Sequence, residues 1–475
     1  MSDPQAIDPA EVEFSPLSLA DESGRLFFWR GRVLRAVGAD RAQEMRDRFA
    51  SGLVAALHQR GLIPAARLTD LRFEGFALVV EHDRLPVVTY PYEWSYRMFR
   101  AAAALVLQVN ELANAHGWEL KDCHGFNVLF DGPDPRYVDL GSLVPIPPGQ
   151  RGWSAAEEFR CCYEYPLEIW RQGDGFTARR WLGAADSLQH ESFLLYRHPF
   201  LRWFGGAPTW GRMLRAWFRF RRLSGAPEEK IRRHLSPGPA AFALWLQALP
   251  WLPAQSFNSA RRRRRLMARE RRWLGSAWGD YQSDYGVPTP RFRRIVETVR
   301  ELQPRTVLEL AGNQGWLSAQ LLAAGAAARV ICTDADEEAV DRAHAALAQR
   351  PQGASLHLAV LDFIFPLATS FGTPPAPRFL SDTVLALAVS HHILLTQRIA
   401  VDRFLAAVGS YARRHVLVEF MPLGLWDGKT APPVPPWYTL DWFRDHFQRR
   451  FRLLREERLE ENRVLFVGEV RPGTG

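Results

Sequence analysis

The C-terminal part of the chain alternates between two hydrophobic periods. Short apolar runs of strand length lie at 306–310, 329–333, 355–360, 383–388, 415–419 and 462–470. Segments with apolar residues at helical spacing precede or separate the first of these runs, at 291–302, 316–324 and 337–349. Strands that alternate with helices predict a doubly wound, mostly parallel sheet. We therefore expect a Rossmann-like α/β domain at 289–475.

The N-terminal part of the chain has a different pattern. Apolar runs at 26–29 and 33–37 flank an Arg-Gly turn, which predicts a β-hairpin, and a further strand is predicted at 76–81. Between them, Asp40 is expected to cap a helix that ends close to Arg60. These elements predict a small lobe that is rich in strands.

Helical patterns dominate the middle of the chain. Apolar residues recur at helical spacing through 94–116, a loop-and-strand region follows at 120–143, and helix-rich segments fill 153–275. The mixture predicts an α+β region ahead of the α/β domain. The division we expect is a flexible N-terminus at 1–20, a strand-rich lobe at 21–90, a helical lobe at 91–255, a basic helical linker at 256–288 and the α/β domain at 289–475.

Composition agrees with a globular protein of more than one domain. The chain has 475 residues, of which 47% are hydrophobic and 24% charged. Its cysteines lack the spacing of a structural zinc site: Cys123, Cys161, Cys162 and Cys332. The first residues are polar and acidic, unlike a signal peptide, and no apolar run is long enough for a transmembrane helix. We expect a cytoplasmic protein; its oligomeric state is not indicated.

The net charge of +8 is concentrated in one run, RRRRRLMARERRW, at 261–273. Such a run can bind nucleic acid or anionic lipid, or it can form the exposed face of a linker helix. Aromatic residues do not interleave with the arginines, and no known nucleic-acid module surrounds them. The composition therefore favours the linker helix over a nucleic-acid partner.

A glycine-rich turn follows the first strand of the α/β domain, in the sequence VLELAGNQGW. Gly312 and Gly315 let the backbone approach a ligand closely and direct N–H groups toward it. The spacing is E-x-x-G-x-x-G, whereas pyrophosphate binding requires G-x-G-x-x-G. The turn suits a ligand with a carboxylate and an amine, and Glu309 is expected to orient the turn or to meet the ammonium through water.

Acidic residues end the next two strands. Asp334 lies at the tip of the second strand, where ribose hydroxyls are held, and Asp362 follows the third strand, where it could accept a hydrogen bond from an adenine amino group. Asp336 is expected to cap the following helix.

Two histidines follow the fourth strand, at the rim where substrates bind in open α/β sheets. His391 or His392 is the candidate general base if the acceptor must lose a proton. Glu419, at the end of the fifth strand, is a weaker candidate.

Taken in order, these residues resemble the class I S-adenosylmethionine-dependent methyltransferases. By this resemblance Gly312, Asn313 and Gly315 match the glycine-rich loop, Asp334 the ribose acid and Asp362 the adenine contact. The chain departs from the family at Ala311, where a further glycine is common, although alanine is also small. The resemblance implies S-adenosylmethionine as cofactor and methyl transfer as reaction; the alternative is a degenerate domain that binds nothing.

A second constellation lies in the segment HGWELKDCHGFNVLFDGPDPRYVDLGS. Phosphoryl transfer needs a carboxylate that orients the acceptor hydroxyl and an Asn-Asp pair that holds Mg²⁺. The segment contains residues of these types in Asp122, Asn127 and Asp139. The spacing is similar to the loops of protein kinases and, with His124, to the aminoglycoside and choline phosphotransferases. The resemblance implies that Asp122 is the base and that Asn127 and Asp139 hold magnesium on ATP.

This second resemblance is incomplete. The strand-rich region has no glycine-rich phosphate loop and no lysine on its second strand. Arg35 is the nearest counterpart of that lysine, with Glu44 as its possible partner, and arginine does not simply replace lysine at such a site. The departures favour a kinase-like scaffold that no longer transfers phosphate.

The combination of the two halves resembles one bacterial family, often labelled nodulation host-specificity-like. Its motifs here are PYEW, KD followed by NVLF, and the methyltransferase turn, from about Gly24 to Val470. The resemblance implies a methyltransferase but not what it methylates. We expect an unidentified small-molecule, glycan or lipid-like acceptor and a degenerate kinase-like recognition domain. The alternatives are a bifunctional methyltransferase and Mg-ATP-dependent phosphotransferase, and a non-enzymatic adaptor that uses the arginine run to bind nucleic acid or membrane.

Overall fold

The protein is described by a computed structural model that forms two compact units. The residues described are 5–15, 18, 24–150, 152–183, 188, 192–193, 196, 258–271, 273, 275–276, 278–279, 282, 286, 288–349, 355–367, 369, 372–426 and 429–471. Unit 1 comprises Met1–Arg84, Ala102–Val128 and Tyr137–Arg271, and unit 2 comprises Leu85–Ala101, Leu129–Arg136 and Arg272–Gly475. Residues 197–257 of the helix-rich region expected at 153–275, and parts of the expected N-terminal segment 1–20, lie outside the described residues.

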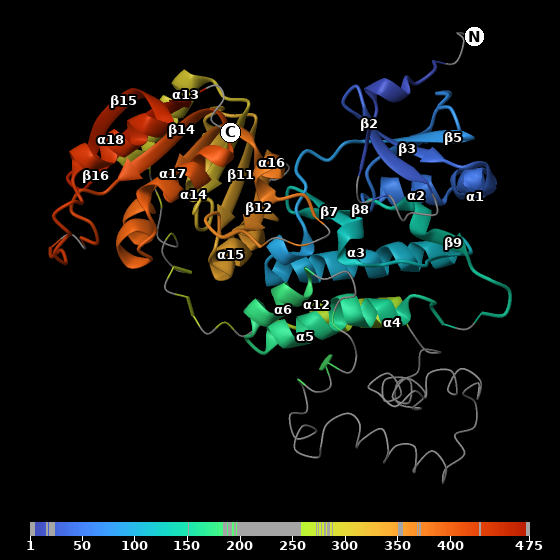
Figure 1. Ribbon diagram of the computed structural model, residues 1–475. Coiled ribbons are helices and arrows are strands. Elements are labelled where there is room, and N and C mark those ends of the chain that lie inside the picture. Colours follow the sequence, from blue (N-terminus) through green and yellow to red (C-terminus); the bar gives the residue numbers. More distant parts are fainter. Residues whose placement is uncertain are drawn as a thin grey trace, which may run out of the picture. The chain divides into compact units, whose positions relative to one another are not determined.

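Unit 2 is built on a seven-stranded sheet (Figure 1). Its strands are β10 (Thr306–Leu310), β11 (Arg329–Asp334), β12 (Leu356–Val360), β13 (Ser381–Ala386), β14 (Ala412–Phe420), β15 (Phe451–Glu460) and β16 (Arg463–Val470). The order is β12-β11-β10-β13-β14-β16-β15, with β10 to β14 parallel and β16 antiparallel to both of its neighbours. The expected doubly wound, mostly parallel sheet is confirmed.

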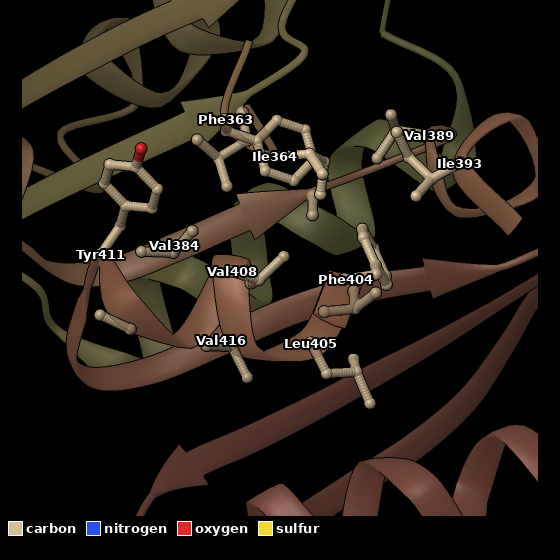
Figure 2. Close-up of a cluster of buried hydrophobic side chains, with 14 of the residues drawn as sticks. Phe363, Ile364, Val384, Val389, Ile393, Phe404, Leu405, Val408, Tyr411 and Val416 are labelled. Carbon is tan, nitrogen blue, oxygen red and sulfur yellow. The ribbon is translucent and has the colours of Figure 1, made fainter. Parts of the chain in front are cut away.

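Six helices of unit 2 are described: α13 (Pro290–Leu302), α14 (Trp316–Ala323), α15 (Glu337–Leu347), α16 (Pro375–Phe379), α17 (Val401–Ser410) and α18 (Leu440–Arg450). Helix α17 covers one face of the sheet, where Phe404 and Val408 lie with Val384 of β13 and Val416 of β14 (Figure 2). Successive strand residues point to opposite faces, so Glu419, three positions beyond Val416, points to the other face.

Helix caps explain where several elements begin. Asp336 accepts hydrogen bonds from the backbone N–H groups of Glu338 and Ala339, which confirms it as the cap of α15. The expectation for Asp40 was wrong, because α1 (Ala39–Ala50) begins after Gly38. Asp40 therefore already lies in the first turn of α1.

The helix expected to continue toward Arg60 is also interrupted. Gly52 has a φ of 77°, a left-handed conformation that glycine adopts without steric cost, and α2 (Leu53–Gln59) starts anew after it. The periodicity of apolar residues runs through this break, which is why the pattern alone did not reveal it.

Unit 1 contains a five-stranded antiparallel sheet. Its strands are β1 (Glu13–Phe14), β2 (Arg25–Trp29), β3 (Arg32–Val37), β4 (Ala66–Leu68) and β5 (Leu78–His82), in the order β1-β2-β3-β5-β4. The predicted hairpin is confirmed, with Arg30 and Gly31 in left-handed conformations at its turn. Phe27, Leu34 and Phe73 pack together on one face of the sheet.

The other elements of the N-terminal half are short, except for one long helix. They are α3 (Tyr96–Ala115), β6 (Trp118–Leu120), β7 (Val128–Asp131), β8 (Asp134–Tyr137), β9 (Leu143–Pro145), α4 (Ala156–Phe159), α5 (Tyr165–Arg171), α6 (Gly175–Trp181) and α12 (Ser259–Met267). Three of the boundaries between the two units fall within α3, β7 and β8. None of the helices in the described parts of the chain has the length and hydropathy needed to cross a bilayer.

The arginine run forms α12, and acidic side chains of unit 1 pair with several of its arginines. Arg262 lies 2.5 Å from Glu164, and Arg263 lies 3.2 Å from Glu111. Leu266 is buried, so the helix packs through an apolar position as well. These contacts agree with a packed helix at this position.

A segment of the N-terminal half, Leu85–Ala101, belongs to unit 2 through a buried ion pair. Arg378 donates to Glu93 at 2.8 Å and to the backbone oxygen of Val88 at 2.6 Å. The exposed fractions of the two charged side chains are 6% and 4%. The Arg378 guanidinium also lies 4.2 Å from the centre of the Tyr90 ring. The PYEW motif therefore packs as part of unit 2.

We predict that Glu93→Gln destabilises the protein by about 3 kcal/mol or more, because loss of the Glu93 carboxylate leaves the buried positive charge of Arg378 uncompensated. Glu469→Gln is the matched control, since Glu469 pairs with Arg452 at the surface with exposed fractions of 38% and 67%. That control should change the free energy of unfolding by less than about 0.5 kcal/mol. Urea unfolding of the full chain measures both, and equal effects would contradict the prediction.

Candidate functional site

The glycine-rich turn joins β10 to α14 through several left-handed residues. Ala311, Asn313 and Gly315 have φ values of 54°, 53° and 69°. Only Gly315 adopts this region without steric cost, so Ala311 carries backbone strain where a glycine would carry none. The turn has the tight geometry that the sequence predicts, although the backbone at Ala311 is strained.

Gly312 is required by close packing. A Cβ atom at this position would lie 2.6 Å from Cys332 Sγ and 2.9 Å from Glu309 Cδ. The Gly312 N–H donates to the backbone oxygen of Thr333 at 2.9 Å, which ties the turn to β11. The turn is thus held directly against the neighbouring strand.

Glu309 faces inward and braces the turn. Its carboxylate accepts hydrogen bonds from the backbone N–H and the hydroxyl of Ser318, in the first turn of α14. Burial raises the pKa of Glu309 to about 7. Of the two roles considered for Glu309, its contacts favour orientation of the turn.

Asp334 ends β11 and reaches across to the turn. Its two carboxylate oxygens accept hydrogen bonds from the backbone N–H groups of Asn313 and Asp336, both at 2.8 Å. Burial raises the pKa of Asp334 to about 6. Each carboxylate oxygen can accept a further hydrogen bond, so the group keeps capacity for a ligand.

Asp362 is exposed and shapes the turn after β12. It accepts hydrogen bonds from the backbone N–H groups of Ile364 and Phe365 at 3.0 and 2.9 Å. Because β12, β11 and β10 are adjacent parallel strands, Asp362, Asp334 and Gly312 all lie at the same edge of the sheet.

The two candidate histidines follow β13, which pairs with β10 on its other side. The rings of His391 and His392 have their centres 4.0 Å apart. Burial lowers the pKa of His391 to about 3, and its Nδ1 atom is buried without a hydrogen-bond partner. His392 is half-buried, and burial also lowers its pKa. Both imidazoles are therefore neutral near pH 7.

Glu419, the weaker candidate base, is bound in a network of arginines. Both of its oxygens accept hydrogen bonds from Arg291 at 2.6 Å, and Arg463 lies 3.3 Å away. Burial alone would raise the pKa of Glu419, but Arg291 and Arg463 outweigh burial and hold the pKa below its ordinary value. The carboxylate also accepts from the backbone N–H of Ala388, which makes it an anchor for the segment before the histidines.

Sequence reasoning missed the segment that covers the glycine-rich turn. The backbone oxygens of Trp278 and Gly279 accept hydrogen bonds, both at 2.8 Å, from the side chains of Asn313 and Gln314. The rings of Trp278 and His392 meet in a T-shaped arrangement, with their planes at 71° and their centres 4.8 Å apart. No periodicity marks this stretch, so it was expected to be part of a linker; its tryptophan was the available signal.

Gln282 occupies the start of α14. Its side-chain oxygen accepts a hydrogen bond from the Trp316 N–H at 3.3 Å, and its amide donates to the Gly312 oxygen at 3.4 Å. In dinucleotide-binding proteins this end of the helix receives a pyrophosphate. Here a neutral amide of the protein fills that position.

In unit 1, Asp139 is bound by protein groups. It accepts hydrogen bonds from Arg35 at 2.8 Å, from the Gly141 N–H at 3.0 Å and from the Ser142 hydroxyl. Burial alone would raise the pKa of Asp139, but Arg35 and these donors hold it low. Arg35 thus pairs with Asp139, whereas Glu44, its expected partner, bonds to Arg48 at 2.7 Å.

The other two members of the constellation meet at one tyrosine. The Tyr137 hydroxyl donates to the Asp122 backbone oxygen at 2.8 Å and accepts from the Asn127 amide at 3.4 Å. The Asp122 side chain lies near His124 and Glu158, and burial together with Asp122 raises the pKa of Glu158 to about 7.

The contacts of Asp139 bear on whether these groups could hold a magnesium ion. Mg²⁺ needs free carboxylate oxygens in octahedral geometry, but the guanidinium of Arg35 already bonds to Asp139. Across the residues that the structure describes, no three His, Cys, Asp or Glu side chains gather in a way that could hold a metal ion. The role of Asn127 and Asp139 as metal ligands stays a prediction, and the Arg35 guanidinium would compete with a metal ion for Asp139.

No model of a known protein family matches the chain. The chain is similar to nodulation protein NoeA of Rhizobium meliloti (strain 1021), at 27% identity over 439 residues that cover 85% of this chain and 84% of that protein. N-methyltransferase NodS from Bradyrhizobium japonicum WM9, solved with S-adenosyl-L-homocysteine, aligns with 42% of the chain and 94% of its own length, at 12% identity and a TM-score of 0.29. An S-adenosylmethionine-dependent methyltransferase from Clostridium acetobutylicum ATCC 824 aligns with 41% of the chain and 96% of its own length, at 11% identity and a TM-score of 0.30.

We predict that Glu309→Gln makes unit 2 less sensitive to pH. The pKa of Glu309 is raised in the folded state, so its stabilising contribution is complete below pH 4.5 and is lost as pH rises through about 7. Relative to the variant, the wild type should lose on the order of 3 kcal/mol of unfolding free energy between pH 5 and pH 8. Urea unfolding at both values measures this, and parallel pH profiles of the two proteins would contradict it.

Proposed function

We propose that unit 2 binds S-adenosylmethionine and transfers its methyl group to an acceptor. The observation that carries the proposal is the meeting of the Gly312 turn, Asp334 and Asp362 at one edge of a doubly wound sheet. Counted along the chain, the strand order is 3-2-1-4-5-7-6, so the order reverses between β10 and β13. Ligands of open α/β sheets bind at that reversal, beyond the carboxyl ends of the strands.

Each residue at this edge has a role in the proposal. The turn formed by Ala311, Gly312, Asn313 and Gly315 faces the amino-acid part of the cofactor, and Glu309 holds the turn in place from below. Asp334 accepts hydrogen bonds from the ribose hydroxyls with the capacity left on its two oxygens. Asp362, exposed beyond β12, accepts from the adenine amino group.

Gln282 separates this proposal from dinucleotide binding. A pyrophosphate at the start of α14 would have to displace the Gln282 side chain from Trp316 N–H and Gly312 O. It would also approach the carboxylates of Glu309 and Asp334, both of which lie beneath the turn. A ligand without phosphate avoids both penalties, as S-adenosylmethionine does.

The chemistry requires alignment more than proton transfer. When bound, the cofactor supplies an electrophilic methyl group on a sulfonium. The protein positions the acceptor in line with that group and excludes water. His391 and His392, neutral near pH 7, lie after β13 at the same edge, where one of them can accept a proton from the acceptor. His392 is the less buried of the two, and we assign the contact with the acceptor to it.

Unit 1 is proposed to be a degenerate kinase-like domain that recognises the acceptor. Its antiparallel sheet, in which α1 follows β3 along the chain, supports this proposal, and Arg35 of β3 bonds to Asp139. The similarity to NoeA spans both halves of the chain, which supports a function shared between them. The acceptor is a small molecule, a glycan or a lipid-like compound.

Isothermal titration calorimetry with S-adenosylmethionine tests the main proposal. We expect the wild type to bind, and Asp334→Ala to lose about 2–4 kcal/mol of binding free energy, because two hydrogen bonds to a charged acceptor disappear. Asp402→Ala, an exposed carboxylate on α17, is the control and should bind like the wild type. A wild type that does not bind the cofactor would end the proposal.

For unit 1 we expect no rise in melting temperature on addition of Mg-ATP, because Arg35 occupies the Asp139 carboxylate that the metal would need. Differential scanning fluorimetry of the full chain measures this. A saturable stabilisation that Asp139→Ala removes would instead favour the bifunctional enzyme.

A further inference from the structure

The exposed apolar side chains of unit 2 are unevenly distributed. The large hydrophobic residues with the greatest exposure in this unit are Trp278, Phe365, Leu423, Trp437 and Leu454. Phe365 follows β12, and Leu423 and Trp437 follow β14, so these three lie in loops at the carboxyl ends of parallel strands. Trp278 lies on the glycine-rich turn after β10. Exposed apolar side chains that gather at a ligand-binding edge mark a binding surface.

Contacts within unit 2 connect these loops around the histidines. Trp278 meets the ring of His392 from the side of the glycine-rich turn. On the other side, a Cβ at Gly424 would lie 2.8 Å from both Leu395 and Val434, so the loop after β14 packs tightly on the segment that follows the histidines. The segment His392–Thr396 therefore packs against two others, the one with Trp278 and the loop after β14 that carries Trp437.

Charged groups next to the histidines are already paired. Arg463 lies 3.3 Å from Glu419 and 2.9 Å from Glu460, and Glu419 is also held by Arg291. By contrast, the buried Nδ1 of His391 has no hydrogen-bond partner. The surroundings offer flat apolar contact and neutral hydrogen bonding, which suits an uncharged aromatic ligand better than an ionic one.

We propose that the methyl acceptor is a phenol, bound with its ring against Trp278 and its hydroxyl beside His392. This inference rests on the proposed methyltransferase function. In the reaction the phenol oxygen forms a bond to the methyl carbon, and the carbon–sulfur bond breaks with its electron pair going to sulfur. The phenol proton passes to the His392 imidazole and then to water. The products are an aryl methyl ether, S-adenosylhomocysteine and a proton.

The protonation chemistry agrees with this acceptor. Burial lowers the pKa of His392, so its imidazole is a weak base. A phenol, with a pKa of about 10, is far more acidic than an alcohol. A weak base such as His392 can therefore remove the proton of a phenol more readily than that of an alcohol.

Methyl transfer from radiolabelled S-adenosylmethionine by the full chain tests the proposal, with p-cresol and 4-phenylphenol as probes. We expect both phenols to be methylated, and the matched cyclohexanols not to be. Trp278→Ala should raise the KM for the phenols about tenfold with a smaller change in kcat, because a stacking contact is lost. Trp278→Phe should restore most of the affinity. Leu454→Ala removes an equally exposed apolar side chain on β15 and should match the wild type.

His392→Gln provides a second readout. It should lower kcat for the phenols at least about a hundredfold while leaving the affinity for S-adenosylmethionine unchanged by calorimetry. If the wild type binds S-adenosylmethionine but neither binds nor methylates the phenols, the phenol proposal is overturned and the methyltransferase proposal stands. The phenol proposal is also overturned if Trp278→Ala and Leu454→Ala behave alike. If the cofactor itself does not bind, both proposals fall together.

Discussion

The buried ion pair between Arg291 and Glu419 is the constraint on which the candidate site depends. It joins the first helix of the α/β region, α13, to β14, and the two side chains are 7% and 0% exposed. A lone carboxylate at that depth would be protonated or would destabilise the fold, and the two hydrogen bonds from Arg291 keep it charged. The same carboxylate accepts from Ala388, a non-glycine residue with a φ of 51°. The strained backbone at Ala388, just before the histidines, is thus held by the Glu419 carboxylate, and Arg291 stabilises the charge of that carboxylate.

Much of unit 2 could be predicted because its local signals agree with one another. The strands β10 to β14 are short apolar runs, Asp336 is a helix cap by type and position, and the glycines at Gly312 and Gly315 lie where close packing and a left-handed turn require them. The charged strand β15 was missed, since FRLLREERLE has too many charges for a buried strand and lies at the edge of the sheet. Edge strands carry less of the hydrophobic pattern on which such predictions rest.

What could not be predicted depends on partners far away in the sequence. Asp139 and Asp334 are both aspartates that follow a strand, and both lie in motifs with a known resemblance. Arg35, more than a hundred residues earlier, bonds to the first, whereas backbone N–H groups bond to the second and leave capacity for a ligand. The segment with Trp278 and Gln282 could not be predicted either. Its role depends on its packing against the glycine-rich turn, and its own sequence has no periodicity that would indicate this.

The pair between Glu93 and Arg378 has a consequence for how the chain is made. The two residues are 285 positions apart, and most of unit 1 is synthesised between them. As the ribosome works from the N-terminus, the PYEW segment emerges long before the strands on which it packs, and closing so long a loop costs entropy before any contact repays it. Unit 1 can therefore fold while the synthesis of unit 2 is still incomplete. The nascent chain must keep Leu85–Ala101 available in water until the last part of the protein leaves the ribosome.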